Sequence, residues 1–181
     1  MRILAVSGSL RSSSFNTNLL RAAQNLSPAG VTIDIFEIGS LPPYNDDVRV
    51  AGYPPDVAQW RAAIAGADAL LFATPEYNYS VPGVLKNAID WASRPPDMPL
   101  AGKPAAIMGA SGGLGGTIRA QHHLRQIFVF VDVLALNKPE VVVREAARKF
   151  DADGNLTDED TRQHVAKLVE ALVAWTRRLA T

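Results

Sequence analysis

The sequence predicts an α/β domain in which a parallel sheet carries helices on both faces. Short apolar runs rich in β-branched residues alternate along the 181-residue chain with segments whose apolar residues recur at helical spacing. Strands separated by helices pair in parallel, and a parallel sheet needs cover on both faces. Because 48% of the residues are hydrophobic and 20% are charged, the chain can bury one core, and we expect a single domain over residues 1–181.

Each strand and helix is predicted from its own local pattern. The expected strands are residues 3–6, 31–36, 69–73 and 103–108, with a fifth strand at either 131–136 or 140–143. Helical spacing begins at Leu19, and further helices are expected at residues 56–66, 81–93, 116–128 and 158–179. The predicted N-terminal caps are Asp56, Ser80 and a capping box of Thr157 with Asp160. Four prolines predict a long loop over residues 39–55.

Five strand–helix units in one small domain favour a flavodoxin-like sheet with the strand order 2-1-3-4-5. Open parallel sheets bind their ligands beyond the carboxyl ends of the strands, near the point where the strand order reverses. The loops that follow the first, third and fourth strands therefore form the predicted binding site. They are also the stretches of the chain with the most unusual composition.

The first of these loops, SGSLRSSSFNTN at residues 7–18, is rich in hydroxyl and amide groups and contains one arginine. It leads into a helix, whose N-terminal N–H groups and dipole favour an anion. One helix cap needs only one such side chain. We therefore expect a phosphate to bind Ser9, Arg11, Ser13, Ser14, Asn16 and Thr17. Neither G-x-x-x-x-G-K-[ST] nor G-x-G-x-x-G is present, which favours a single terminal phosphate, as in FMN, although simple helix capping is the alternative.

The second loop, TPEYNYSVPG at residues 74–83, places two tyrosines after the third strand. Pro75 stiffens the turn, and Asn78 tolerates unusual backbone dihedral angles. We expect these residues to form a rigid wall for a flat aromatic ligand, made of Pro75, Glu76, Tyr77, Asn78 and Tyr79. The alternative is an ordinary strand-to-helix turn with two half-exposed tyrosines.

The third loop, ASGGLGG at residues 110–116, holds four glycines in five residues, which lets the backbone approach a ligand closely. The expected ligand contacts are Ser111, Gly112, Gly113 and Gly115. Residues 109–113 also match G-x-S-x-G, the nucleophile turn of α/β-hydrolases, with His164 downstream and Asp132 or Asp151 between them. A hydrolase would lack the H-G-G-G oxyanion segment and would leave the serine-rich loop without a role, so it is the weaker alternative.

Three segments in this order resemble the NADPH-dependent FMN reductase family of flavodoxin-like proteins: GSLRSSSFNTNLL, TPEYNYSVPGVLKNAIDWASRP and GASGGLGGTIRAQHHLR. The resemblance implies a noncovalent FMN, with its phosphate on Ser9, Arg11, Ser14 and Asn16 and its ring against residues 75–79 and 111–115. It also implies that NAD(P)H transfers a hydride to the flavin, which then reduces a quinone, chromate, an azo dye or another flavin. The cofactor carries this chemistry, so no catalytic side chain is expected.

The same resemblance implies a homodimer or homotetramer, with residues 89–92 and 122–125 as candidate subunit contacts. An alternative within this fold is a flavodoxin-like electron carrier that has no NAD(P)H activity of its own. Such carriers are usually strongly acidic, whereas this chain has 18 basic and 18 acidic residues. We therefore expect an enzyme.

Composition argues against several other classes of protein. A net charge of zero does not suit a nucleic-acid surface. The chain has no cysteine, which excludes thiol catalysis and thiolate metal sites, and no apolar run approaches the ~20 residues of a membrane helix. No metal site is expected, because DADGNLTDED at residues 151–160 departs from the calcium-loop pattern and the adjacent His122 and His123 point apart on a helix. Without a recognisable signal peptide, a cytoplasmic protein is expected.

Overall fold

The computed structural model describes residues 1–180. Its strands are β1 (Arg2–Ser7), β2 (Thr32–Phe36), β3 (Ala69–Ala73), β4 (Pro104–Ala110), β5 (Leu134–Ala135) and β6 (Val141–Val143). Its helices are α1 (Phe15–Asn25), α2 (Asp46–Ala51), α3 (Pro55–Ala65), α4 (Gly83–Ala92), α5 (Ile118–Phe130), α6 (Glu159–Leu179) and the short 3₁₀ helix η1 (Ala146–Arg148). The predicted alternation of strands and helices is confirmed.

The strands pair in parallel in the order β2-β1-β3-β4-β5, which confirms the predicted order. Two short strands share the fifth position, so the sheet has six strands rather than the predicted five. Pro104, at the start of β4, lies opposite Leu134 of β5, and Ala110, at its end, lies opposite Val143 of β6. Both candidate segments for the fifth strand are therefore strands, because β4 is long enough to pair with each of them in turn.

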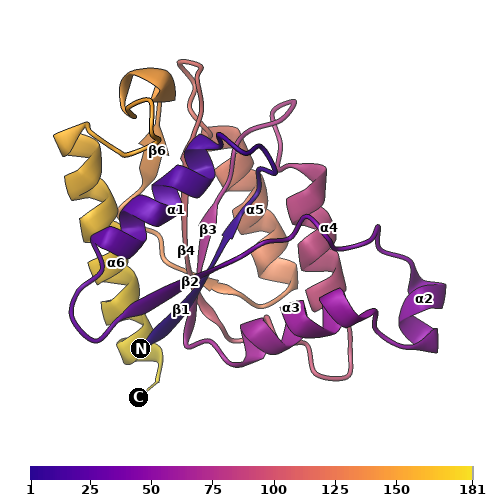
Figure 1. Cartoon of the computed structure of the whole chain (residues 1–181). Coiled ribbons are helices and arrows are strands. Elements are labelled where there is room, and N and C mark those ends of the chain that lie inside the picture. The colour runs from indigo at the N-terminus through magenta and orange to yellow at the C-terminus, as the bar shows by residue number, and fades with distance from the viewer. Residues whose placement is uncertain (181) are drawn as a thin grey trace.

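The sheet lies between two layers of helices, with α1 and α6 on one face and α3, α4 and α5 on the other (Figure 1). Side chains alternate along β1, so Ile3 and Ala5 face α1 and α6 while Leu4 and Val6 face the other layer. Every residue of β3 is buried, as expected for a central parallel strand. The loops predicted to form the site all leave the carboxyl ends of these strands.

Two helices on the second face begin differently from the prediction. α3 follows Pro54 without a side-chain cap. The predicted cap, Asp56, lies instead in the first turn of α3, where a carboxylate interacts favourably with the helix dipole. α4 begins after Pro82, so Ser80 does not cap it. In both cases a proline at the helix start supplies the suitable φ angle without a hydrogen-bonding side chain.

The cap of α6 lies one residue later than predicted. Asp158 accepts a hydrogen bond from the N–H of Thr161 at 2.9 Å, in place of the expected capping box of Thr157 and Asp160. The short helix α2 forms inside the predicted loop over residues 39–55, with Asn45 as its cap. The prolines that predict a loop lie outside α2, so they interrupt none of its hydrogen bonds.

The three tryptophans pack on the helices, as predicted. Trp60 and Trp91 are buried, and their ring N–H groups donate to the carbonyl oxygens of Ala88 at 2.8 Å and Pro42 at 2.7 Å. The ring N–H of Trp175 donates to the carbonyl oxygen of Leu134 at 2.8 Å. Each indole therefore keeps a hydrogen-bond partner, while Trp60 and Trp91 are fully buried and Trp175 is half-buried.

Gly109, near the end of β4, lies very close to the neighbouring segments. A Cβ atom at this position would overlap the hydroxyl of Thr117 and the carbonyl oxygen of Thr74. Glycine is required here for close packing and not for conformational freedom, since other residues readily adopt the backbone conformation of Gly109. The contact brings the end of β4 close to the end of β3 and the start of α5.

We predict that Gly109→Ala lowers the free energy of unfolding by about 1–3 kcal/mol, because the neighbouring threonines must move to admit the methyl group. Gly83→Ala is the control: its Cβ would meet nothing within 4 Å, and the position lies in α4. Its stability should be unchanged or higher by about 0.5–1 kcal/mol. Urea unfolding followed by circular dichroism measures both, and a Gly109→Ala variant as stable as wild type would contradict the prediction.

Candidate functional site

The three loops predicted to form the site meet in one pocket of about 230 Å³ at the carboxyl ends of β1, β3 and β4. We call it the three-loop pocket. Its lining residues are Ser9, Arg11, Ser14, Phe15, Asn16, Pro75, Glu76, Tyr77, Ala110, Ser111 and Gly112. The predicted site residues that do not line it are Ser13, Thr17, Asn78, Tyr79, Gly113 and Gly115. Segments that are far apart in the sequence therefore come together as the sheet topology predicts.

The loop after β1, residues 8–14, combines one helix cap with groups that can bind a ligand. Ser14 is the N-cap of α1, and its Oγ accepts a hydrogen bond from the N–H of Thr17 at 3.2 Å. The capping interpretation therefore holds for Ser14. The exposed guanidinium of Arg11 contacts the hydroxyl of Ser13 at 3.4 Å, and no carboxylate within residues 1–180 pairs with it. Its positive charge is available to an anion in the pocket.

Asn16 has a structural role that was not predicted. It is only 3% exposed, its Nδ2 donates to the carbonyl oxygen of Ala110 at 2.9 Å, and its Oδ1 accepts from the N–H of Ala110 at 2.9 Å. The sequence predicts only a phosphate contact for Asn16, whereas the structure shows that its side chain also supports the fold. The amide ties the start of α1 to the end of β4, and so joins two walls of the pocket.

The loop after β3 forms a tight turn that presents both tyrosines to solvent. The N–H of Tyr77 donates to the carbonyl of Ser80 at 3.0 Å, and the N–H of Ser80 donates to the carbonyl of Tyr77 at 2.9 Å. Between them, Asn78 and Tyr79 have φ angles of 49° and 65°, as in type I′ turns. A left-handed backbone is uncommon for an aromatic residue, and such strain is concentrated at functional sites.

Glu76 fastens this turn to the start of α5. Its carboxylate accepts hydrogen bonds from Nε of Arg119 at 2.5 Å and from the N–H groups of Arg119 and Ala120 at 3.0 and 3.2 Å. The guanidinium of Arg119 also lies 3.7 Å from the centroid of the Tyr79 ring, a cation–π contact. Burial raises the pKa of Glu76, but these hydrogen bonds and the charge of Arg119 lower it by more, so the pKa lies below its usual value.

The loop after β4 contains glycines with two different roles. Gly112 and Gly113 are exposed, and a Cβ at Gly112 would meet nothing within 4 Å, which leaves room for a ligand. Gly116 has a φ angle of +60°, and a Cβ there would overlap the side chain of Val142. The hydroxyl of Ser111 accepts the N–H of Gly113 at 3.1 Å and orders the exposed part of the loop.

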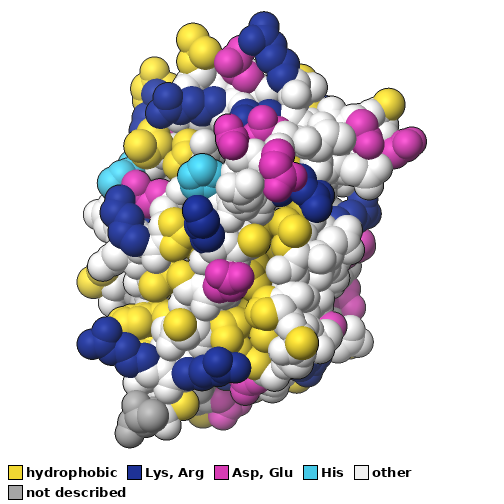
Figure 2. Space-filling view, turned by 90° about the vertical axis from the view of Figure 1, so that its left-hand side faces the viewer, with side chains coloured by type: hydrophobic (Ala, Val, Ile, Leu, Met, Phe, Trp, Pro, Cys, Tyr) yellow, Lys and Arg dark blue, Asp and Glu magenta, His cyan; other side chains and the backbone are white. Residues whose placement is uncertain are grey.

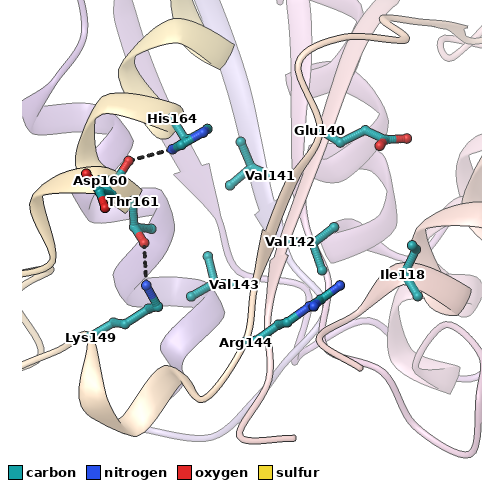
Figure 3. Close-up of a pocket in the computed structure, with 10 residues that line it drawn as sticks. All are labelled: Ile118, Glu140, Val141, Val142, Val143, Arg144, Lys149, Asp160, Thr161 and His164. Atoms are coloured by element: carbon teal, nitrogen blue, oxygen red, sulfur yellow. Dashed lines mark hydrogen bonds between the residues drawn. The ribbon is translucent and has the colours of Figure 1, made fainter. Parts of the chain in front are cut away.

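The structure does not assemble the hydrolase triad. Ser111 lies in the three-loop pocket, whereas His164 lines a separate pocket of about 380 Å³ between β6 and α6 (Figure 3). The Nδ1 of His164 is within hydrogen-bonding distance, 2.6 Å, of the carbonyl oxygen of Asp160. Asp151 accepts backbone N–H groups of its own turn, and Asp132 follows the C-terminal end of α5. The hydrolase alternative is therefore wrong.

The acidic segment over residues 151–160 forms a hydrogen-bonded turn. Oδ1 of Asp151 accepts the N–H groups of Asp153 and Asn155 at 3.0 and 2.8 Å, and Gly154 has a φ angle of +84°. Across residues 1–180, no three or more His, Cys, Asp or Glu side chains are grouped so that they could hold a metal ion. In the same part of the chain, no helix has the length and apolar character needed to cross a membrane.

Comparison with known proteins identifies the family. The model of a family described as NADPH-dependent FMN reductase matches residues 1–148. The chain belongs to this family. It is 55% identical to an NAD(P)H-dependent FMN reductase of Pseudomonas aeruginosa, over 99% of this chain and 97% of that protein. It is 50% identical to an NADPH:quinone oxidoreductase of Arabidopsis thaliana, over 99% of this chain and 93% of that protein.

A solved structure supports the same assignment. FerB, a flavoenzyme NAD(P)H:(acceptor) oxidoreductase from Paracoccus denitrificans, matches with a TM-score of 0.89 and 38% sequence identity. The match covers 98% of this chain and 97% of FerB. Fold and family are therefore shown by the same comparison.

Three residues at the site of this family member were not predicted from the sequence: Phe15, Ala110 and Arg119. Phe15 and Ala110 line the pocket, but their residue types carry no chemical signal. Arg119 has a signal that could have identified it. It lies in the first turn of α5, where a positive charge is unfavourable to the helix dipole, so a carboxylate partner is expected nearby.

We predict that the stability difference between wild type and Glu76→Gln depends on pH. At pH 7 the variant should be less stable by about 1.5–3 kcal/mol, because it loses charged hydrogen bonds to Arg119 and the α5 backbone. The folded protein lowers the pKa of Glu76, so this contribution is present above the unfolded-state pKa. It is lost as the pH falls through the lower folded-state pKa, and the difference should shrink.

Urea unfolding at pH 7 and at several values below the usual glutamate pKa of 4.5 measures this difference. Glu170→Gln is the matched control, because Glu170 is exposed on α6. Its stability relative to wild type should be within about 0.5 kcal/mol at every pH. A Glu76→Gln difference that does not change with pH would contradict the proposed charge pairing with Arg119.

Proposed function

We propose that this protein binds FMN noncovalently in the three-loop pocket and uses it to transfer electrons from NAD(P)H to quinones. When bound, FMN accepts a hydride from NAD(P)H and passes the reducing equivalents to the acceptor. The observation that carries the proposal is the convergence of the serine-rich loop, the tyrosine turn and the glycine loop on one pocket. Relatives named as FMN reductases and quinone oxidoreductases support it.

The loop after β1 fits the phosphate of FMN. The first N–H groups of α1 have no partners within the helix, and Ser14 satisfies only that of Thr17. Ser9 and Arg11 face the same pocket. The phosphate would take charge-assisted hydrogen bonds from Arg11 and further ones from Ser9 and the helix N-terminus. Asn16 would contribute by holding the two loops in place.

The ring of FMN would lie over the other two loops. The pocket volume of about 230 Å³ is below the roughly 300–1,000 Å³ of sites that enclose a whole ligand. Part of the cofactor would therefore extend over Tyr77, Tyr79 and residues 111–115. The tyrosines offer aromatic faces, and the glycines offer backbone without side chains, so both surfaces suit a flat ring.

The acceptor side of the reaction follows from this placement. The two loops would cover one face and the edges of the ring and leave the other face open. We expect quinones as acceptors, and chromate, azo dyes and free flavins as further ones, because an open face admits compact molecules of several kinds. A cytoplasmic location would suit a cysteine-free protein that uses NAD(P)H.

The electron-carrier alternative is not favoured. The named relatives include proteins that use NAD(P)H themselves. The chain also has equal numbers of acidic and basic residues, 18 of each, rather than the strong negative charge usual for such carriers.

We also propose that the protein is a homodimer or homotetramer. Val129 and Phe130 at the end of α5 are hydrophobic side chains that are 84% and 80% exposed. Separately, on the side of the molecule where α6 lies, hydrophobic side chains gather in a central band bordered by charged ones (Figure 2). The sequence predicted subunit contacts at residues 89–92. This prediction is wrong for Ile89, Trp91 and Ala92, because they are buried within the chain. Of the predicted contacts at residues 122–125, Leu124 is wrong for the same reason, whereas His122 and His123 are exposed, Arg125 is half-buried, and these three remain candidate contacts.

We predict that Arg11→Ala weakens FMN binding by about 10- to 150-fold, the equivalent of losing a charged hydrogen bond of ~1.5–3 kcal/mol. Arg148→Ala is the control, because Arg148 is an exposed residue of η1 that pairs with Glu145 and does not line the pocket. Titration of FMN-free protein with FMN, followed by flavin fluorescence, measures the affinity. Equal affinities of Arg11→Ala and wild type would mean that the phosphate does not lie on this loop.

A kinetic prediction follows from the single open face of the ring. NAD(P)H and the quinone must each approach the same flavin atom to within roughly 3–3.5 Å. They should therefore compete for the same space, and NAD(P)H must leave before the quinone enters. Double-reciprocal plots at several quinone concentrations should be parallel, as in a ping-pong mechanism. Intersecting lines with a detectable ternary complex would show instead that two separate faces or sites are used.

A further inference from the structure

A second pocket lies on the other side of the loop after β1. It is bounded by that loop, by the first half of α1 and by the end of β2, and its volume is about 380 Å³. We call it the β2 pocket. Ser9 and Arg11 line both the β2 pocket and the three-loop pocket, so ligands in the two would lie on opposite sides of one loop. The volume falls in the range of pockets that bind small molecules.

One wall of the β2 pocket is apolar. Leu10 is 54% exposed, and its Cδ2 would lie 3.4 Å from a Cβ built at Gly39. Ile35 and Phe36 continue this wall. Phe36 is held in place by the ring of Trp60, with the two ring centroids 5.0 Å apart. An apolar surface of this kind suits one face of a flat heterocycle.

The polar groups of the β2 pocket match a different part of a ligand. Glu37 directly follows β2 and is exposed in the pocket. Arg21 donates a hydrogen bond to Oδ1 of Asn18 at 3.1 Å, but no carboxylate within residues 1–180 pairs with it. A carboxylate accepts hydrogen bonds from a sugar diol, and an unpaired guanidinium binds a phosphate. The hydroxyls of Ser12 and Thr17 add further polar contacts.

We propose that the β2 pocket binds the adenosine phosphate half of NAD(P)H. Glu37 would accept hydrogen bonds from the ribose, Arg21 would bind the phosphate, and the apolar wall would cover the adenine. In nucleotide-binding β-α-β units, an acidic residue near the end of the second strand binds the ribose in this way. The inference rests on the proposed function, in which NAD(P)H is the electron donor and Arg11 serves the phosphate of FMN.

The proposal separates the donor from the acceptor. The nicotinamide half and the quinone would share the space over the flavin ring, but only NAD(P)H would reach the β2 pocket. The fragment 5′-AMP should therefore inhibit competitively against NAD(P)H. Against the quinone, it should give parallel double-reciprocal lines, because it does not obstruct the ring.

Direct binding of 5′-AMP tests the site without turnover. Isothermal titration of FMN-loaded and FMN-free protein should show binding to both, with no release of flavin. Glu37→Ala and Arg21→Ala should each weaken this binding at least ten-fold, and inorganic phosphate should bind at least ten-fold more weakly than 5′-AMP. The matched controls are Glu170→Ala and Arg177→Ala, which change exposed residues of α6 and should bind 5′-AMP like wild type.

Steady-state kinetics of the same variants gives a second readout. Glu37→Ala and Arg21→Ala should raise the KM for NAD(P)H about ten-fold and leave kcat and the KM for quinone unchanged, because they remove binding that is equal in the ground and transition states. Both residues are exposed, and unfolding experiments should show stabilities close to wild type.

Three results would overturn the inference: 5′-AMP that displaces FMN, 5′-AMP that binds no better than phosphate, or binding that both variants leave unchanged. Failure of the proposed function would look different. A protein that binds 5′-AMP in a Glu37- and Arg21-dependent way but never oxidises NAD(P)H would keep the nucleotide site and lose the reductase assignment. Normal NAD(P)H turnover together with variant-insensitive 5′-AMP binding would keep the reductase assignment and remove the β2 pocket from it.

Discussion

The hydrogen bonds between the amide of Asn16 and the backbone of Ala110 hold the three-loop pocket in one arrangement. They join residues 94 positions apart, and both partners are buried. Removing the amide would leave a buried N–H and a buried C=O without partners, at a cost of about 1–3 kcal/mol for each group. Because Asn16 and Ala110 come from two different segments that line the three-loop pocket, the shape of that pocket depends on this contact.

Two further contacts place the remaining wall. Glu76 joins the tyrosine turn to the first turn of α5, and Gly109 lets the end of β4 approach Thr74 at the end of β3. All three contacts involve backbone or buried groups. They therefore hold the loops in place while Tyr77 and Gly112 stay exposed. A site that is ordered before its ligand binds loses less conformational entropy on binding.

The chemistry of the family resides in its cofactor, so the protein acts through binding and placement. Arg11 lies between two pockets, one that brings together the three site loops and one at the end of β2. In the arrangement that we propose, the serine-rich loop serves two ligands, with the FMN phosphate on one side and the nucleotide of the electron donor on the other. The segment from β1 to Glu37 would then act as one nucleotide-binding unit.

The sequence by itself determined where most strands and helices lie, because hydrophobic periodicity is a local property, and the number of β-α units predicted the strand order. The family followed from the resemblance of three sequence segments, which the family comparison confirms. Only the tertiary structure decided what Asn16 and Glu76 contact, since their partners lie 94 and 43 residues away and residue type does not specify such pairings. It also decided that Ser111 and His164 lie in different pockets, which removed the hydrolase alternative. The segments over residues 131–136 and 140–143 have similar local strand propensity, so the sequence could not choose between them as the fifth strand. Only the structure shows that both contain strands, because β4 is long enough to pair with each.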